Sequence, residues 1–164
     1  MSDGEISADD PRSADVRELL ERHLEFANSH GPPEDVHALD LDGLLDPAVT
    51  FFSLRRDGEL LGVGALKQLD GCHAELKSMH TAEAARGRGV GRAMVGHLIA
   101  VARDRGFRRL SLETGSMAAF APARALYASA GFTQCEPFGD YSPSRNSTFM
   151  TLSLHSADPH AAQR

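Results

Sequence analysis

The stretch Arg86-Gly87-Arg88-Gly89-Val90-Gly91 constrains the fold of this chain more than any other feature. The residues before it, Glu75 to Thr81, form an extended run, and apolar residues from Val90 to Ala102 recur at helical spacing. Three glycines in five residues allow positive φ angles and a close ligand approach. Free N–H groups at a helix start bind phosphate. The segment therefore predicts a strand, a glycine-rich turn and a helix around an anion site; the simpler alternative is a surface turn that needs glycine only for its corner.

Two common phosphate-binding motifs do not fit this stretch. A P-loop requires Gly-Lys followed by Ser or Thr, and the chain contains no Gly-Lys pair. A dinucleotide-binding fingerprint requires a third glycine, but Arg92 occupies that position. The segments ahead of the loop also predict a β-meander, whereas that fingerprint belongs to a βαβ unit. The anion site must therefore belong to another class.

Composition and charge exclude several classes of partner. The 164 residues carry a net charge of −6 with 41% hydrophobic residues, which suits one acidic globular domain. Nucleic acid and anionic membranes need a basic face, so neither partner is expected. Positive charge is concentrated between Arg86 and Arg109, as a small polyanionic ligand requires. Cys72 and Cys135 form no disulfide or metal pattern, and the acidic N-terminus is unlike a signal peptide, so we expect a cytoplasmic protein.

Periodicity and turn signals divide the chain into alternating elements. Asp57-Gly58 and Asp70-Gly71 are hairpin signals between strand-like runs, Gly106 and Gly131 follow predicted helices, and Pro122 fits a first helical turn. We expect one α/β domain over residues 5–155, with disorder in residues 1–4 and 156–164. The expected helices are 13–27, a short one from residue 33, 90–105 and 120–130, and the expected strands are a weak one at 5–8, then 49–56, 59–69, 73–81, 108–114, 132–135 and 148–154.

Two motifs in this order resemble the GNAT (GCN5-related) N-acetyltransferases. Arg86, Gly89 and Gly91 match that family's coenzyme A pyrophosphate loop, Arg/Gln-x-x-Gly-x-Gly/Ala. The run from Ala123 to Phe132 is similar to its A-x-x-L-Y-x-x-x-G-F motif. The resemblance covers about residues 15–154 and is strongest to a bacterial small-molecule acetyltransferase subgroup. It implies a mixed, mostly antiparallel sheet flanked by helices.

The resemblance also implies the cofactor contacts. Acetyl-CoA would be the acetyl donor, no metal would take part, and pantetheine would pair with the strand before the loop, which splays from its neighbour at a bulge. A backbone N–H there, by analogy that of Met79, would polarise the thioester carbonyl. The expected cofactor-binding residues are Met79, His80, Thr81, Arg86, Gly87, Arg88, Gly89, Val90, Gly91 and Arg92.

Two residues are the predicted catalytic groups. Tyr127 matches the tyrosine that protonates the departing thiolate in many GNAT enzymes. Glu75 lies eleven residues before Arg86, where histone-type members carry a general base, and strand alternation would put it on one face with Lys77 and Met79. Glu113 and a water relay are the competing candidates for the base.

One position departs from the family pattern. Many members have asparagine seven residues before the tyrosine, and here that residue is Phe120. A contact to pantetheine would then be missing or supplied by Ser116. A catalytically inactive acyl-CoA-binding module or sensor is therefore the alternative to an N-acetyltransferase that acetylates a primary amine by direct attack in a ternary complex.

The acceptor and the oligomeric state are predicted from regions that vary among GNAT enzymes. With Lys77 near the mouth, Arg145 would suit a carboxylate-bearing amine such as an amino acid. Apolar residues Phe149, Met150 and Leu152 predict a homodimer through the last strands. The candidate acceptor-binding residues are Glu34, His37, Glu113, Tyr141, Arg145 and Asn146.

Overall fold

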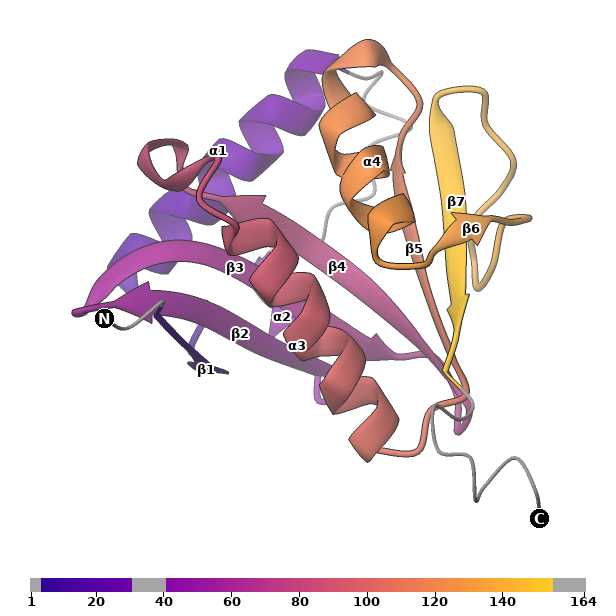
Figure 1. The fold of residues 1–164 in the computed structure, drawn as a ribbon, viewed down its shortest axis with the longest axis horizontal. Coiled ribbons are helices and arrows are strands. Elements are labelled where there is room, and N and C mark those ends of the chain that lie inside the picture. Colours follow the sequence, from indigo (N-terminus) through magenta and orange to yellow (C-terminus); the bar gives the residue numbers. More distant parts are fainter. Residues whose placement is uncertain (1–3, 31–40, 155–164) are drawn as a thin grey trace.

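A computed structural model describes residues 4–30 and 41–154 of the chain. These residues contain a seven-stranded sheet in the order β1-β2-β3-β4-β5-β7-β6 (Figure 1). All neighbouring strands pair antiparallel except β4 and β5, which are parallel. The predicted mixed, mostly antiparallel sheet is confirmed. The strands are β1 (Glu5–Ala8), β2 (Val49–Arg56), β3 (Glu59–Gln68), β4 (His73–Thr81), β5 (Arg109–Gly115), β6 (Thr133–Gln134) and β7 (Ser147–Ser153).

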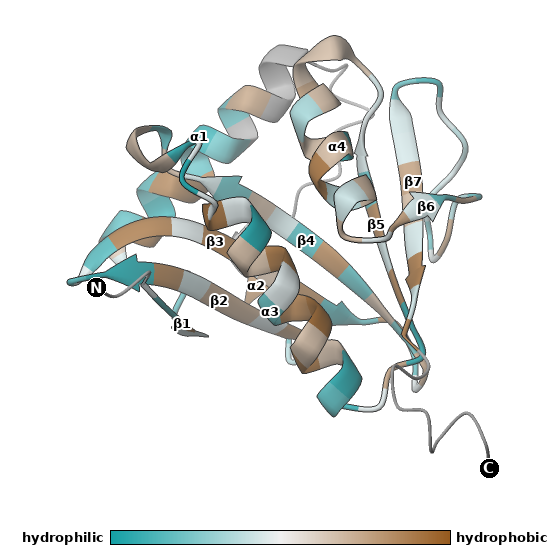
Figure 2. Cartoon of the chain, viewed as in Figure 1, coloured by the Kyte–Doolittle hydropathy of each residue, from teal (hydrophilic) through white to brown (hydrophobic). Residues whose placement is uncertain are grey.

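Helices cover both faces of the sheet. The helix α1 (Ala14–His30) and the short α2 (Leu41–Leu44) lie on one face, and α3 (Val90–Asp104) crosses the other (Figure 1). The helix α4 (Ala121–Ser129) has Pro122 in its first turn and packs beside α3. Hydrophobic (brown) and hydrophilic (teal) residues alternate along α3 in Figure 2, as in an amphipathic helix with one face on a sheet.

The two faces bury separate apolar clusters. The larger lies under α3 and α4, where Met94, Val95 and Leu98 pack on the sheet with exposed fractions of 1% or less. The smaller lies under α1, where Val16 and Leu19 pack on the sheet. Fully burying a large aliphatic side chain is worth about 1.5–3 kcal/mol, so these two layers hold the elements around the site in place.

The strands β4 and β5 form a fork. Their parallel pairing includes only three residue pairs, from His73↔Arg109 to Glu75↔Ser111, after which the strands diverge. Beyond that point β5 continues to pair with β7 up to Gly115, so the gap opens toward β4 alone. The chain thus keeps both arms of the fork supported while leaving space between them.

A β-bulge in the β4 arm changes which face its side chains occupy. Val63 pairs with His80 but Ala65 pairs with Lys77, so β4 carries one extra residue, and Ser78 there has a positive φ of 55°. Directly opposite residues share a face, so Lys77 and His80 lie on the α1 face. Met79 instead packs into the cluster under α3. The expectation that Glu75, Lys77 and Met79 share a face is therefore wrong for Met79, because the bulge breaks the alternation.

Two of the three residues of the predicted dimer surface are buried. The strand β7 lies between β5 and β6, and Phe149 and Met150 are buried with 4% and 6% exposure. An apolar surface for dimerisation is therefore wrong for Phe149 and Met150, whereas Leu152 is half-buried, and the homodimer stays a prediction.

Some sequence predictions fall outside the described residues. These are the disorder of residues 1–3 and 156–164 and the start of the helix predicted from residue 33. Within the described parts of the chain, none of the helices combines the length and apolarity needed to cross a membrane.

Candidate active site

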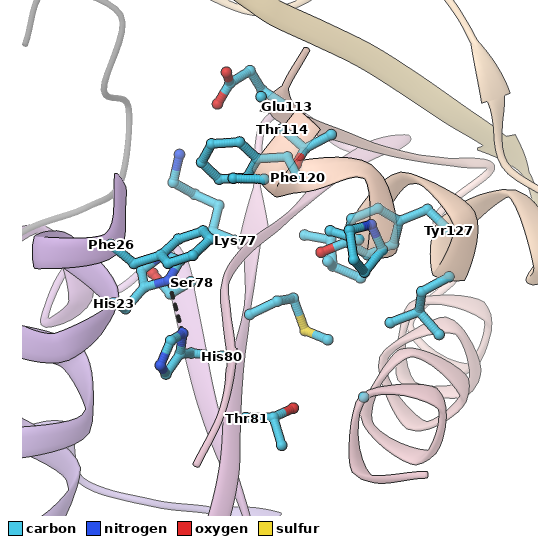
Figure 3. Close-up of a pocket in the computed structure, with 18 of the residues that line it drawn as sticks. His23, Phe26, Lys77, Ser78, His80, Thr81, Glu113, Thr114, Phe120 and Tyr127 are labelled. Carbon is cyan, nitrogen blue, oxygen red and sulfur yellow. Dashed lines mark hydrogen bonds between the residues drawn. The ribbon is translucent and has the colours of Figure 1, made fainter. Parts of the chain in front are cut away.

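A cavity of about 540 Å³ occupies the fork between β4 and β5 (Figure 3). Its walls come from α1, the second half of β4, the glycine loop, the end of β5, the start of α4 and the segment before β7. Most of the lining is apolar, and His23, Lys77, Ser78 and His80 form a polar group on the α1 side. The residues discussed below that line it are His23, Phe26, Glu75, Lys77, Ser78, Met79, His80, Thr81, Arg86, Gly87, Gly89, Val90, Gly91, Glu113, Met117, Phe120, Tyr127, Tyr141 and Asn146.

The glycine-rich loop forms one end of this cavity. Gly87 and Gly89 have φ angles of 77° and 80°, a region that glycine adopts without strain. Gly89 is the N-cap of α3, and the first N–H bonded within the helix is that of Ala93, to the Gly89 carbonyl. By helix geometry, the N–H groups of Val90 to Arg92 have no intrahelical partner and point out of the helix start. This is the arrangement that binds phosphate oxygens.

Gly91 brings the loop close to the opposite wall. A Cβ at this position would lie 3.0 Å from Leu126 Cδ2 of α4 and 3.8 Å from Thr81 Oγ1 of β4. A larger residue would therefore narrow the space between α3, α4 and β4. The narrow space beside Gly91 fits a pantetheine arm, and the N–H groups at the start of α3 fit its pyrophosphate.

The three arginines of the loop region occupy different positions. All are exposed, but only Arg86 lines the cavity. Arg92 lines a separate groove between α3 and α4, with Ile99 and Arg103. Of the three arginines predicted to contact the cofactor, Arg86 alone lines the cavity.

A buried polar cluster lies where the fork closes. Lys77 Nζ donates to Glu75 Oε2 at 3.0 Å and to the Tyr141 hydroxyl at 2.8 Å, and that hydroxyl donates to the same Glu75 oxygen at 2.6 Å. The side chains of Lys77 and Glu75 are only 7% and 4% exposed. Burial, followed by the nearby Glu75 charge, raises the pKa of Tyr141, so it stays protonated. The cluster ties β4 to the segment before β7.

Tyr127 projects from α4 on the opposite side of the cavity (Figure 3). Burial raises its pKa, and the charge of Glu113 acts in the same direction. The phenol is therefore protonated throughout the physiological pH range. Its ring packs edge-on against Phe132, with centroids 6.0 Å apart, which fixes its orientation.

Phe120 closes the cavity toward α1. Its ring contacts Phe26 of α1 edge-on, with centroids 5.2 Å apart (Figure 3). It also covers Gly115 so closely that any Cβ there would collide with the ring. The expected substitute, Ser116, is exposed and donates its hydroxyl to the Arg145 carbonyl instead. Ser116 is not among the residues that line the cavity, so the structure does not support that expectation.

Two histidines that the sequence reasoning did not connect meet at the cavity. His23 Nδ1 of α1 lies 3.3 Å from His80 Nδ1 of β4 (Figure 3). Burial lowers the pKa of each to about 4, and for His80 the neighbouring His23, Arg86 and Arg22 act in the same direction. Both rings are thus neutral near pH 7. The signal for His23 was a polar residue within the otherwise apolar stripe of its helix.

The predicted acceptor-side residues are only partly brought together. Tyr141, Glu113 and Asn146 line the cavity, whereas Arg145 is exposed and lies outside its lining. Glu34 and His37 belong to the segment between the described ranges. In residues 4–30 and 41–154, no group of three or more His, Cys, Asp or Glu side chains is arranged to hold a metal ion.

The comparisons with known proteins define the class of this fold and site. Residues 14–132 match the Acetyltransferase (GNAT) family, so the chain belongs to that family. It is 48% identical to YsnE, an uncharacterised N-acetyltransferase of Bacillus subtilis (strain 168), over 91% of this chain and 99% of the relative. It is 35% identical to a protein of Azospirillum brasilense named IAA acetyltransferase, over 91% and 97% of the two chains.

A solved structure shares the fold at lower identity. A Bacillus subtilis acetyltransferase in complex with CoA superimposes with a TM-score of 0.68 over 92% of this chain and 99% of the other, at 19% identity. Together with the family match and the names of the relatives, this supports an acetyl-CoA-dependent acetyltransferase. The recognition drawn from the two sequence motifs is confirmed.

Proposed function

We propose that this protein transfers the acetyl group of acetyl-CoA to a primary amine of a small molecule, by direct attack in a ternary complex. The single observation that carries the proposal is the continuity of the cavity in the β4–β5 fork. One volume joins the anion-binding loop at Gly87 and Gly89, the phenol of Tyr127 and the polar groups of the α1 side. Two substrates entering from opposite ends would meet beside the β4 bulge.

The cofactor arm is assigned to the loop side of the cavity. The unpaired N–H groups at the start of α3 and the side chain of Arg86 would hold the pyrophosphate. The backbone of β4 from Met79 to Thr81 would pair with pantetheine, as an added strand pairs with a sheet edge. Arg88 and Arg92 would contribute only through long-range attraction, because neither lines the cavity.

The transfer then requires one bond to form and one to break. The amine nitrogen attacks the thioester carbon, the C–S bond breaks, and the leaving thiolate takes the phenolic proton of Tyr127. The Met79 N–H would stabilise the negative oxygen that develops on the carbonyl. Holding the two reactants in line is worth about 7–11 kcal/mol of the barrier, so positioning contributes the larger part.

The amine must also lose a proton. Glu75 was predicted as the base, but its Oε2 already accepts hydrogen bonds from Lys77 and Tyr141. Glu113 lines the same cavity, and its charge acts on both Tyr127 and Tyr141. We therefore favour Glu113, directly or through water, as the proton acceptor and assign Glu75 to holding the buried cluster.

The apolar side chains that line the cavity favour an acceptor amine with an apolar body. Phe26, Phe120 and Met117 line the cavity. The two cations that we expected to bind a carboxylate are not placed to do so, because Lys77 is paired with Glu75 and Arg145 lies outside the lining. We therefore place aryl-alkyl amines ahead of free amino acids.

A panel assay tests the proposal. The purified protein would be incubated with acetyl-CoA and phenethylamine, benzylamine, a polyamine, several amino acids and a lysine peptide, with detection of free thiol and acetylated product. We expect turnover, fastest with an aryl-alkyl amine. Tight coenzyme A binding without turnover on any amine would contradict the proposal and support an acyl-CoA-binding module instead.

A further inference from the structure

Ser78 combines two unfavourable features at one position. It is a non-glycine residue with φ of 55°, in the left-handed region, and it lies inside a strand. Asp57, the other such residue in the described ranges, sits in a hairpin turn where that conformation is common. Ser78 is also buried, and its Oγ has no hydrogen-bond partner among the described residues.

The fold does not require a serine here. Glycine would adopt the same φ without strain, and alanine would remove the unpaired hydroxyl while leaving the backbone as it is. Buried polar groups without partners are uncommon in native structures, and strained backbone persists chiefly where function uses it. Because Ser78 lines the cavity of the fork, its missing partner is best sought in a bound substrate.

The neighbouring residues indicate which substrate that is. Ser78 lies between Lys77, which faces α1, and Met79, and Figure 3 shows Ser78 near His23 and Phe26 of that helix. Met79 packs under α3 instead, and the glycine loop follows the end of β4 at Thr81, three residues beyond Ser78. The acceptor, not the pyrophosphate end of the cofactor, is therefore the substrate nearest to Ser78.

The chemistry of the attacking nitrogen selects a hydroxyl over an ammonium. A neutral primary amine directs its lone pair at the thioester carbon, so its N–H groups need hydrogen-bond acceptors. A serine hydroxyl offers two lone pairs, whereas a lysine ammonium only donates and repels any cationic amine. Lys77 cannot serve this role, and Ser78 can.

We propose that Ser78 Oγ accepts a hydrogen bond from the attacking nitrogen of the acceptor amine and orients its lone pair toward the thioester. The inference rests on the proposed acetyl transfer to an amine and adds a binding residue to that site. Ser78 itself forms and breaks no covalent bond. Its contribution is to position the amine, so it affects the acceptor and leaves acetyl-CoA binding unchanged.

Two substitutions at Ser78 separate the hydroxyl from the backbone. Ser78→Ala keeps the strained φ and Ser78→Gly relieves it, and both remove the hydroxyl. With phenethylamine, or the panel amine that the unmodified protein acetylates fastest, we expect both variants to lose about 5- to 100-fold in kcat/KM for the amine. The KM for acetyl-CoA should stay unchanged in both. The melting temperature should be at least as high as that of the unmodified protein in Ser78→Ala and higher in Ser78→Gly.

Ser147→Ala is the matched control. Ser147 Oγ is also buried without a partner among the described residues, but Ser147 does not line the cavity. Its removal should change neither Michaelis constant. Unchanged amine kinetics in Ser78→Ala, or a loss confined to the acetyl-CoA KM, would overturn the role of Ser78 alone. Absence of turnover by the unmodified protein on every amine would overturn the proposed function and this inference with it.

Discussion

The two faces of β4 bury different chemistry. On the α3 face, Leu76 and Met79 join an apolar cluster that continues through the helix. On the α1 face, Glu75, Lys77 and His80 place charged and polar groups against α1 and the segment before β7. Apolar packing on the first face stabilises the fold without any ligand, whereas the second face places polar groups beside a cavity. The α3 face of β4 thus stabilises the fold, and the α1 face is the one that we expect to bind substrate.

Tyr127→Phe should have the largest effect on activity, because it removes the hydroxyl proposed to protonate the leaving thiolate. We expect kcat to fall about 10²–10⁴-fold with acetyl-CoA binding unchanged, because the hydroxyl acts only as the thiolate leaves. Steady-state kinetics with calorimetric binding measure both. Full kcat under conditions where chemistry is rate-limiting would show that water or another group protonates the thiolate.

Glu75→Gln would test the polar face. It removes the carboxylate that pairs with the buried ammonium of Lys77, so the free energy of unfolding should fall by about 3–5 kcal/mol in denaturant titrations. The control is Glu75→Gln combined with Lys77→Met, which removes the uncompensated charge and should recover part of that loss. If Glu75→Gln kept its stability and lost only kcat, Glu75 would be the general base after all.

Gly64→Ala would test the apolar face at the bulge. A Cβ on Gly64 would lie 2.8 Å from both Met79 Sδ and Met94 Cγ, so the two side chains must move. We expect a loss of about 1–3 kcal/mol in the free energy of unfolding. The control is Gly96→Ala on α3, where a Cβ would meet nothing within 4 Å and should stabilise the helix by about 0.5–1 kcal/mol. Equal effects at the two glycines would contradict the packing described here.

The smallest expected effect is a dependence of stability on pH from His23 and His80. Each has a folded pKa of about 4, below the ordinary value of 6.5, so the unfolded chain binds more protons between these values. Stability should therefore be complete above pH 6.5 and fall as pH drops toward 4. The slope should approach about 1.4 kcal/mol per pH unit for His23, and be less for the more exposed His80.

Denaturant titrations between pH 6.5 and 4.5 measure this slope. The double variant His23→Asn, His80→Asn should flatten it, and an unchanged slope would show that other groups cause the loss.

The sequence predicted well the elements that pack on the apolar face of β4. The hairpin signals at Asp57-Gly58 and Asp70-Gly71 and the helical spacing after Val90 are local patterns, and β2, β3, β4 and α3 appear where they indicate. Gly106 and Gly131, expected after helices, have the positive φ angles of such positions. Local periodicity determines these elements because each can bury its apolar side in only one way.

The arrangement of the polar residues around the cavity depends on long-range contacts that no local sequence pattern encodes. The bulge at Ser78 lies where β4 still pairs with β3 but no longer with β5, and it places Met79 on the α3 face. Tyr141 reaches Glu75 across 66 positions of sequence. His23 shares helical spacing with Val16, Leu19 and Leu20, and only the fold brings it to His80. The roles assigned to these site residues stay predictions.

Two-substrate kinetics on one variant from each end of the cavity test the central claim most directly. Arg86→Ala, at the loop end of the cavity, should raise the KM for acetyl-CoA by about 10- to 100-fold and leave the amine KM unchanged. Phe26→Ala, on the α1 side, should raise only the amine KM, and the double variant should show the product of the two effects. If both variants raised the same KM, the two substrates would not occupy separate ends of the cavity, and the account would be wrong.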